Sequence, residues 1–333
     1  MRHQLFAGAA LAALLSPVAV YAQETTSSIR GQVTADGAPI AGATVTVIHT
    51  PSGTRSVVIS DAGGNFDAAG LRVGGPFTIS VSASGYPSTQ ITDVQTQAGQ
   101  PYDLPVELAA GGEEIVVTAM AVKKAGSTSQ GPLTVLDSEA IKNVASLNRD
   151  VRDLERRDPF ARLDLSPTGG RAVSFAGQNP RFNRFSVDGV AITDNFGLNP
   201  DGLPSRRGPV PLDAIEQFQV KLAPYDVREG NFQGGAINVV LKSGTNQFHG
   251  SAFYSYTSDD LTGTRTKNTR VTLPSFTSKD YGAQLSGPII KDKLFFMIAG
   301  ERVRAGTPIP EGPTDNNAGT PIPGITQALV DQV

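Results

Sequence analysis

Apolar and polar residues alternate along most of the chain in short runs, the pattern of β-strands that bury one face. Several such runs follow one another between Ser28 and about Leu108. Turn-forming residues separate them at Asp36-Gly37, Pro51-Ser52-Gly53, Gly63-Gly64-Asn65, Gly74-Gly75-Pro76 and Gly85-Tyr86-Pro87. The spacing predicts a small β-sandwich over residues 27–109.

A mixed pattern follows over residues 132–243. Leu133 to Leu136 is typical of a short strand, and Asp137 or Ser138 can cap a helix whose apolar positions continue to Leu147. Further on, Asp188-Gly189 between two apolar runs predicts a two-residue β-hairpin, in which Asp188 is a turn residue. Together these elements indicate a small α/β domain.

A second short helix is expected around Val151 and Leu154. The charged residues Arg149, Asp153 and Arg157 follow one another at intervals of four, so their side chains can pair on one face. We expect that face to be exposed to solvent.

From residue 244 onward the alternating runs are longer. Three strands are expected within 248–256, 281–286 and 294–303, each with an apolar and a polar face, and Phe253 is the exception on a polar face. The segments between them, one short and one long, fit the turns and loops of an outer-membrane barrel. Residues 244–333 are too few to close even an eight-stranded barrel, so they predict an incomplete antiparallel barrel that ends in a truncated loop.

The chain begins like a secretory signal peptide. A basic start precedes the apolar run Leu5 to Leu15, Ser16-Pro17 breaks the run, and cleavage is expected after Ala22. The run is too short to span a membrane as a helix. Residues 1–22 are therefore expected to direct export and to be removed.

Composition excludes several kinds of function. The formal net charge is -3, which excludes a uniformly basic nucleic-acid binder. There is no cysteine, and His3, His49 and His249 are the only histidines, so a metal site built from these residue types is not expected. The chain also lacks the common hydrolase, metalloprotease and nucleotide-binding motifs. We expect no catalytic residues, no cofactor and no enzyme activity.

The first domain resembles a known family. The residues from Gly31 to Tyr86 spell G-x-V-x-x-x-x-G-x-P-I-x-G-A-x-V-x-V, then D-A-G-G-N-F, then P-F-T-I-S-V-S-A-S-G-Y. This order resembles the carboxypeptidase regulatory-like domain, a transthyretin-like sandwich that is grouped with carbohydrate-binding-like folds. Asp61, Asn65 and Asp67 lack the spacing of an EF-hand loop, so a plain turn is expected there.

The segment after the sandwich, residues 110–131, reads as a linker that contains the β-prone stretch Glu113 to Ala119. A strand without a partner beside it can add to the sheet edge of another protein. The stretch resembles the TonB box, by which TonB-dependent receptors engage the inner-membrane energy transducer. The resemblance assigns this contact to Glu114, Ile115, Val116, Val117, Thr118 and Ala119. The alternative is one more strand of the sandwich or of the next domain.

The domain after the linker carries the most specific resemblance. The motifs are the runs 182–190, 215–216, 224–226, 234–238 and 242–250, which read FNRFSVDGV, IE, PYD, GGAIN and KSGTNQFHG. In this order they are similar to the plug and the first barrel strand of Oar-like TonB-dependent receptors. The resemblance implies that residues 132–243 form a plug inside an outer-membrane barrel and residues 244–333 its first three strands.

The expected protein is therefore mainly β, with a sandwich, a small α/β plug and an incomplete outer-membrane barrel. As the resemblance implies, it is the front end of a TonB-dependent receptor for energy-coupled uptake, in the outer membrane with the sandwich in the periplasm. Its partners would be the TonB complex, outer-membrane lipid and an unknown ligand such as a siderophore, glycan or peptide. A fragment of a longer receptor and a truncated reading frame are both open.

Polar, irregular loops between the plug strands are the candidate ligand contacts. The two loops are Gln178 to Arg181 and Asn195 to Arg207, and the candidate residues within them are Gln178, Asn179, Arg181, Asn195, Arg206 and Arg207. Packing of these loops on the barrel wall is the alternative. A different reading of the whole chain, a secreted or periplasmic carbohydrate-binding or adhesion sandwich, would need aromatic stacking platforms, and the chain has no tryptophan.

Overall fold

The computed structural model describes residues 25–109, 111, 115–127, 131–146, 149–165, 171–194, 196–205, 207–222, 233–266, 269–270, 275–306, 311–315 and 320–332. The predicted signal peptide lies outside these residues. The chain divides into two compact units, residues 1–242 with 291–293, and residues 243–290 with 294–333. No helix in the described part of the chain is long and apolar enough to cross a membrane.

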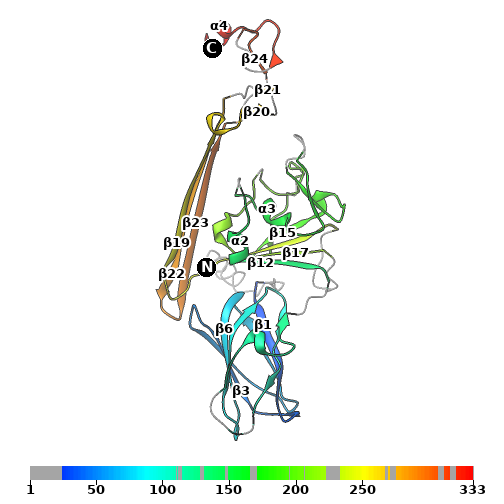
Figure 1. Ribbon diagram of the computed structural model, residues 1–333, viewed down its shortest axis with the longest axis vertical. Coiled ribbons are helices and arrows are strands. Elements are labelled where there is room, and N and C mark those ends of the chain that lie inside the picture. Colours follow the sequence, from blue (N-terminus) through cyan, green and yellow to red (C-terminus); the bar gives the residue numbers. More distant parts are fainter. Residues whose placement is uncertain are drawn as a thin grey trace, which may run out of the picture. The chain divides into compact units, whose positions relative to one another are not determined.

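The first unit begins with the predicted sandwich, drawn in blue to cyan (Figure 1). One sheet has the strand order β11-β8-β1-β2, and β5 and β9 also pair with β1. Its strands are β1 (Ser27–Ala35), β2 (Ala38–Pro39), β5 (Asn65–Leu71), β8 (Pro101–Asp103), β9 (Val106–Glu107) and β11 (Gly126–Ser127). The other sheet has the order β10-β7-β6-β3-β4. Its strands are β3 (Thr44–His49), β4 (Thr54–Ile59), β6 (Gly74–Ser82), β7 (Thr89–Thr96) and β10 (Ile115–Thr118).

Period-two alternation builds the sandwich core. In β6, Phe77, Ile79 and Val81 are buried, while the residues between them are partly exposed. A Cβ on Gly31 would overlap the backbone carbonyl of Leu104, so the first glycine of the sequence motif permits a close approach of two chain segments. The alternating runs thus form one hydrophobic core between the two sheets, as the sequence predicted.

The Asp61 region forms a turn. One carboxylate oxygen of Asp61, Oδ1, accepts hydrogen bonds from the N–H groups of Gly63 and Asn65, each at 2.8 Å. A short polar side chain that bonds the backbone two residues on is a common turn device. The plain turn expected from the sequence is therefore present.

The plug follows in the same unit, drawn in green (Figure 1). Its sheet has the order β12-β17-β18-β15-β16. The strands are β12 (Leu133–Asp137), β15 (Arg184–Val187), β16 (Val190–Ala191), β17 (Ile215–Lys221) and β18 (Ala236–Leu241). The remaining plug elements are α2 (Ser138–Lys142), α3 (Arg152–Glu155), η2 (Pro180–Phe182), η3 (Leu212–Ala214), and the hairpin of β13 (Ala161–Leu163) and β14 (Val173–Phe175). The short helix η1 (Ala119–Ala121) precedes the plug, between β10 and β11.

Two local predictions in the plug are confirmed. Asp137 caps α2, because its carboxylate accepts from the Ala140 N–H at 2.8 Å. Asp188 and Gly189 both have positive φ, 44° and 74°, and join β15 to β16 as a tight hairpin. The Asp188 carboxylate also accepts from the Leu241 N–H at 2.9 Å, which ties the turn to the end of β18.

The second unit is built on an antiparallel sheet of β19 (His249–Ser258), β22 (Thr277–Ile290) and β23 (Leu294–Ala305), in that order. The shorter elements of this unit are β20 (Arg265–Thr266), β21 (Thr269–Arg270), β24 (Glu311–Gly312), β25 (Thr320–Pro321), η4 (Asp259–Leu261) and α4 (Gln327–Val330). The described strands do not close into a barrel, as the chain length predicted.

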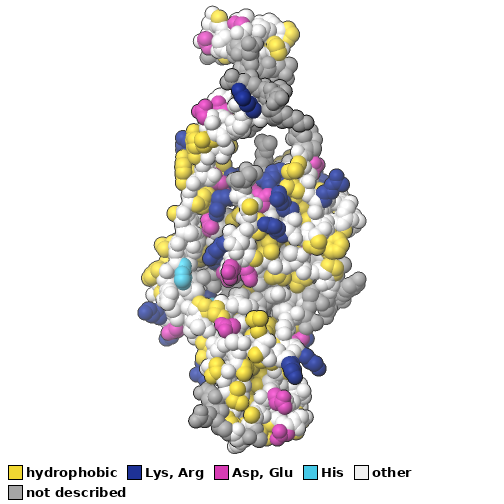
Figure 2. All heavy atoms as spheres, viewed as in Figure 1, with side chains coloured by type: hydrophobic (Ala, Val, Ile, Leu, Met, Phe, Trp, Pro, Cys, Tyr) yellow, Lys and Arg dark blue, Asp and Glu magenta, His cyan; other side chains and the backbone are white. Residues whose placement is uncertain are grey.

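Register explains the faces of this sheet. Tyr254 lies opposite Tyr281, and Leu285 lies opposite Ile298 on the same face, so large apolar side chains share one exposed surface. Figure 2 shows hydrophobic side chains spread along these strands. The exception, Phe253, lies over Gly282 of the neighbouring strand, where a Cβ would come within 2.7 Å of its ring. The missing side chain of one residue thus makes room for a large one on the polar face.

Candidate functional site

The candidate coupling strand, β10, lies at the edge of a sandwich sheet. Residues Ile115 to Thr118 pair in parallel with Thr89 to Thr92 of β7. The expectation of a strand without a partner is therefore wrong for these residues, which form the further sandwich strand that the sequence left as an alternative. Glu114 lies outside the described residues.

The chain then crosses to the other sandwich sheet. Ala119 begins the short helix η1 and is 6% exposed, as part of the sandwich core. Val117, Val122 and Ala125 pack against the same core. β11 then pairs with β8. We call residues 115–127 the strap, because they join an edge of one sheet to an edge of the other.

One edge of β10 is open. The Ile115 N–H donates to the Ser88 carbonyl at 3.1 Å, so Ile115 and Val117 point their backbone groups towards β7. Val116 and Thr118 point theirs to the opposite edge, beside which the described residues place no further strand. The Val116 side chain is 60% exposed. Such an edge is a template for a strand from another chain.

The chain just beyond the end of β7 contacts the plug. Gln217 accepts from the Ala98 N–H at 2.9 Å and donates to the Thr96 carbonyl at 3.3 Å. Gln219 donates to the Ala98 carbonyl at 3.1 Å. Both glutamines are buried, and beside them lies a small apolar cluster of Val73, Ala98 and Val240. Strand β17 of the plug is thereby fixed to the backbone that follows β7.

The two candidate ligand loops meet. Gln178 is exposed, and the Asn179 side chain accepts from the Arg181 N–H at 3.0 Å, which caps η2. Arg181 donates from Nη1 to the Gly197 carbonyl at 3.0 Å, and its backbone lies beside Gly202. The structure thus brings together the two segments that the sequence singled out separately. Asn195 and Arg206 lie outside the described residues.

The second of these loops is held by a carboxylate. Asp194 accepts from the N–H groups of Phe196 and Gly197 at 3.0 and 3.1 Å and from Asn199 at 2.8 Å, and these bonds lower its pKa. Phe196 and Leu198 are 89% and 81% exposed at the tip. The sequence indicated a polar loop over Asn195 to Arg207 and did not single out these two apolar residues within it. Phe196 and Leu198 flank Gly197 shortly after Asp194, and this turn-forming pattern is the signal that could have drawn attention to them.

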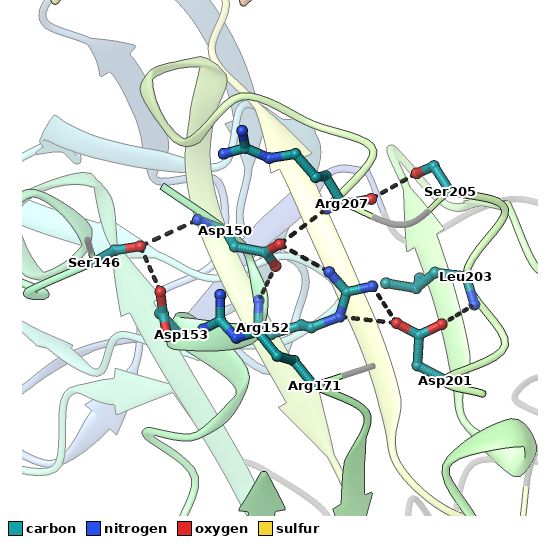
Figure 3. A network of polar contacts seen from close by, with 10 residues as sticks. Ser146, Asp150, Arg152, Asp153, Arg171, Asp201, Leu203, Ser205 and Arg207 are labelled. Carbon is teal, nitrogen blue, oxygen red and sulfur yellow. Dashed lines mark hydrogen bonds and ion pairs between the residues drawn. The ribbon is translucent and has the colours of Figure 1, made fainter. Parts of the chain in front are cut away.

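A buried charge network holds the end of the second loop, around Arg207 (Figure 3). Arg152 is 2% exposed and donates to one oxygen of Asp150 at 2.8 Å and to one oxygen of Asp201 from both Nε and Nη2. Asp150 also accepts from the Gly208 N–H at 3.3 Å. The network therefore ties Asp201 to Arg152 of α3 and Gly208 to Asp150 just before that helix, on the two sides of Arg207 in the chain. No local sequence pattern predicts this network, because Asp201 is 49 positions away from Arg152.

The charged helix face expected at α3 is solvated only at Arg157, which is exposed. Asp153 is 4% exposed and accepts from Ser146 and Arg171, each at 2.6 Å. Arg149 pairs instead with Asp213 at 2.6 Å. The expectation was wrong because loops from elsewhere in the chain fold over the helix and supply partners for its charges.

Glu155 shares this buried environment. Its side chain lies among Arg152, Asp150 and Asp201, and burial raises its pKa to about 8, with the two aspartates adding to the rise. The carboxyl is therefore mostly protonated at neutral pH. With Glu155 protonated, the group of Arg152, Asp150, Asp201 and Glu155 buries less net negative charge than it would with Glu155 ionised.

Histidine and aromatic residues of the sandwich serve its core. His49 is 7% exposed, contacts Ser52 at 2.7 Å through Nδ1 and packs edge-on against Phe77. Burial lowers its pKa to about 4. Phe66 and Tyr102 are buried as well, so they offer no stacking platform for a sugar. Among the described residues, no group of three or more histidine, aspartate or glutamate side chains could hold a metal ion.

Comparison with known families divides the chain in a similar way. The model of the carboxypeptidase regulatory-like domain matches residues 28–109, and the model of an outer membrane beta barrel domain matches residues 240–318. The sandwich is thus a carboxypeptidase regulatory-like domain, and the three-stranded sheet lies within an outer membrane beta barrel domain. These matches indicate the outer membrane as the location of the protein.

Similarity to curated proteins extends over most of the chain. It is 30% identical over 273 residues to the TonB-dependent transporter Oar of Myxococcus xanthus, which covers 78% of this chain and 25% of that protein. It is 30% identical over 217 residues to the probable TonB-dependent siderophore receptor PirA of Acinetobacter baumannii, with 62% and 26% covered. The chain thus spans about a quarter of the length of these relatives.

Solved structures with similarity include a siderophore receptor and an outer membrane transporter. The siderophore receptor PirA from Acinetobacter baumannii is 26% identical, with a TM-score of 0.42 over 54% of this chain and 25% of that one. The transporter YddB from Escherichia coli is 17% identical, with a TM-score of 0.43 over 52% and 26%.

Proposed function

We propose that this chain forms the front end of a TonB-dependent outer-membrane receptor that takes up a ligand by energy coupling and catalyses no reaction. The observation that carries the proposal is the order of its parts. A carboxypeptidase regulatory-like domain precedes a plug-like α/β domain and barrel strands, and most of this order is similar in sequence to the transporter Oar. The sandwich would lie in the periplasm.

We further propose β10 as the strand that engages the TonB complex. In the sequence it lies between the carboxypeptidase regulatory-like match and the plug, and residues 115–118 carry no charge. Its open edge offers backbone groups to a partner strand, and main-chain hydrogen bonds supply affinity in this mode of recognition. Glu114 and Ala119 would flank the contact.

Ligand contact is proposed for the loops around Arg181 and Asp194. Both are exposed, their backbones are held by side-chain hydrogen bonds, and Phe196 and Leu198 add apolar surface. A siderophore, a glycan and a peptide are all compatible with such a mixed surface. The probable siderophore receptor among the relatives makes a siderophore the first ligand class to test.

The coupling proposal is tested at Val116. In Val116→Pro the N–H that points to the open edge is lost, whereas Val116→Ala keeps it and removes only most of the side chain. Binding of the purified periplasmic domain of TonB to the full chain in detergent is measured for both. We expect Val116→Pro to bind at least about tenfold more weakly than Val116→Ala. Equal binding by the two variants would contradict pairing through this edge.

A further inference from the structure

The sandwich contacts the candidate coupling strand along its whole described length. Four successive residue pairs join β10 to β7, and the strap continues through the buried Ala119 to the other sheet. A free peptide of this length would have to be ordered when a partner binds it, at a cost in conformational entropy. On the sandwich the strand is already extended.

We propose that the sandwich presents the coupling strand, and that the energy-coupling partner adds its own strand to the open edge of β10 while β10 stays paired with β7. The inference rests on the proposed coupling function and specifies how the site works. The two edges of β10 use different residues: Ile115 and Val117 face β7, and Val116 and Thr118 face outward. Partner and sandwich therefore do not compete for the same backbone groups.

The chemistry of the open edge defines the partner. Residues 115–118 carry no charge, and in the sequence Glu113-Glu114 precede them and Lys123-Lys124 follow. An uncharged edge bounded by charges of opposite sign suits an extended protein strand, whose backbone supplies the contacts. The product is a six-stranded sheet that runs from the partner through β10 into the sandwich.

Anchoring of the strap gives this sheet a mechanical role. β7 pairs with β10 through its first four residues, and the plug residues Gln217 and Gln219 bond to Thr96 and Ala98 at and beyond its last residue. A pull on β10 therefore acts on β7, and through it on strand β17 of the plug. The sandwich is part of the connection between partner and plug and does more than separate them.

A disulfide lock tests the proposal. The native chain has no cysteine, so Thr89→Cys with Ile115→Cys introduces one pair, at positions that lie directly opposite each other on β7 and β10 and away from the open edge. Neighbouring strands lie about 4.8 Å apart, which is within the range of Cα separations that a disulfide spans. Locking is followed by loss of maleimide labelling, and binding of the purified periplasmic domain of TonB is measured for the oxidised and the reduced full chain.

The proposal expects the lock to form and the two states to bind within about twofold of each other. Loss of binding by about tenfold or more on oxidation, with normal binding after reduction, would overturn it, because β10 would then have to leave β7. Failure of the lock to form would overturn it too. Absence of binding in the reduced double variant and in the native chain would instead refute the proposed coupling function.

Discussion

The side-chain oxygen of Gln217 in the plug accepts a hydrogen bond from the backbone N–H of Ala98 at 2.9 Å. Ala98 lies two residues beyond the end of β7, the strand with which β10 pairs. The Gln217 side chain also donates to the Thr96 carbonyl. A plug residue thus satisfies buried backbone groups that the sandwich leaves unpaired.

Replacement of this glutamine should destabilise the sandwich–plug unit. Gln217→Leu keeps the approximate volume but leaves the buried Ala98 N–H without its acceptor, and we expect a loss of about 1–3 kcal/mol in the free energy of unfolding. Urea denaturation of the full chain measures it. The control is Gln178→Leu at an exposed position, where a change within about 0.5 kcal/mol is expected. Similar effects of both substitutions would contradict a stabilising contact between Gln217 and the backbone at Thr96 and Ala98.

Two glycines of the barrel strands should respond differently to the same substitution. A Cβ on Gly282 meets the Phe253 ring and the Gly300 carbonyl at 2.7 Å, whereas a Cβ on Gly300 meets nothing within 4 Å. We therefore expect Gly282→Val to lower the amount of folded receptor and Gly300→Val to leave it near the native level. Gel mobility of unheated outer-membrane samples reports the folded form. A loss with Gly300→Val alone would contradict the assigned faces.

His49 should make the sandwich less stable in acid. Its pKa falls from 6.5 in the unfolded chain to about 4 in the folded one, chiefly through burial. The unfolded state therefore takes up the proton first, and stability is lost as pH falls from about 6.5 to 4, by up to about 3 kcal/mol. His49→Gln can retain a hydrogen bond to Ser52 but does not titrate. The difference in unfolding free energy between native and variant chains, measured across this range, should follow that loss; a constant difference would refute it.

Glu155 should act in the opposite direction. Its pKa rises from 4.5 to about 8 on folding because the carboxyl is buried, so the unfolded state loses its proton first. Stability is then lost as pH rises from about 4.5 to 8. Glu155→Gln imitates the protonated acid, and we expect it to exceed the native chain in stability at pH 8 by more than about 1 kcal/mol. At pH 4.5 the two should be close. A variant that is less stable than the native chain at both pH values would show that the carboxylate is needed.

Asp194 should hold the candidate ligand loop. Asp194→Ala removes the acceptor of the Phe196, Gly197 and Asn199 N–H groups, and hydrogen exchange at all three should accelerate. Asp194→Asn keeps one oxygen, so only part of the protection should be lost. Unchanged exchange in the alanine variant would mean that other contacts order the loop.

The sequence by itself determined the elements whose causes are local. Alternation with period two set the sandwich strands and the apolar face of the barrel strands, because adjacent side chains in a strand point to opposite sides. Asp188-Gly189 determined a hairpin through its positive φ angles, and Asp137 determined a helix start through its acceptor. Each of these features depends on neighbours within a few residues, so the order of the amino acids is enough to predict it.

Only the tertiary structure decided which distant groups meet. Arg152 is buried against Asp201, which lies 49 positions away. The expectation of a solvated face failed for a similar reason, because Arg171 pairs with Asp153 and Asp213 pairs with Arg149. Arg181 meets the loop at Gly197 in the same way. The sequence allowed the strand at residues 115–118 to be either unpaired or paired with a sheet edge. Such a strand forms backbone hydrogen bonds with any exposed sheet edge that lies close enough. The edge of β7 lies beside it in the fold, and that placement made it part of the sandwich.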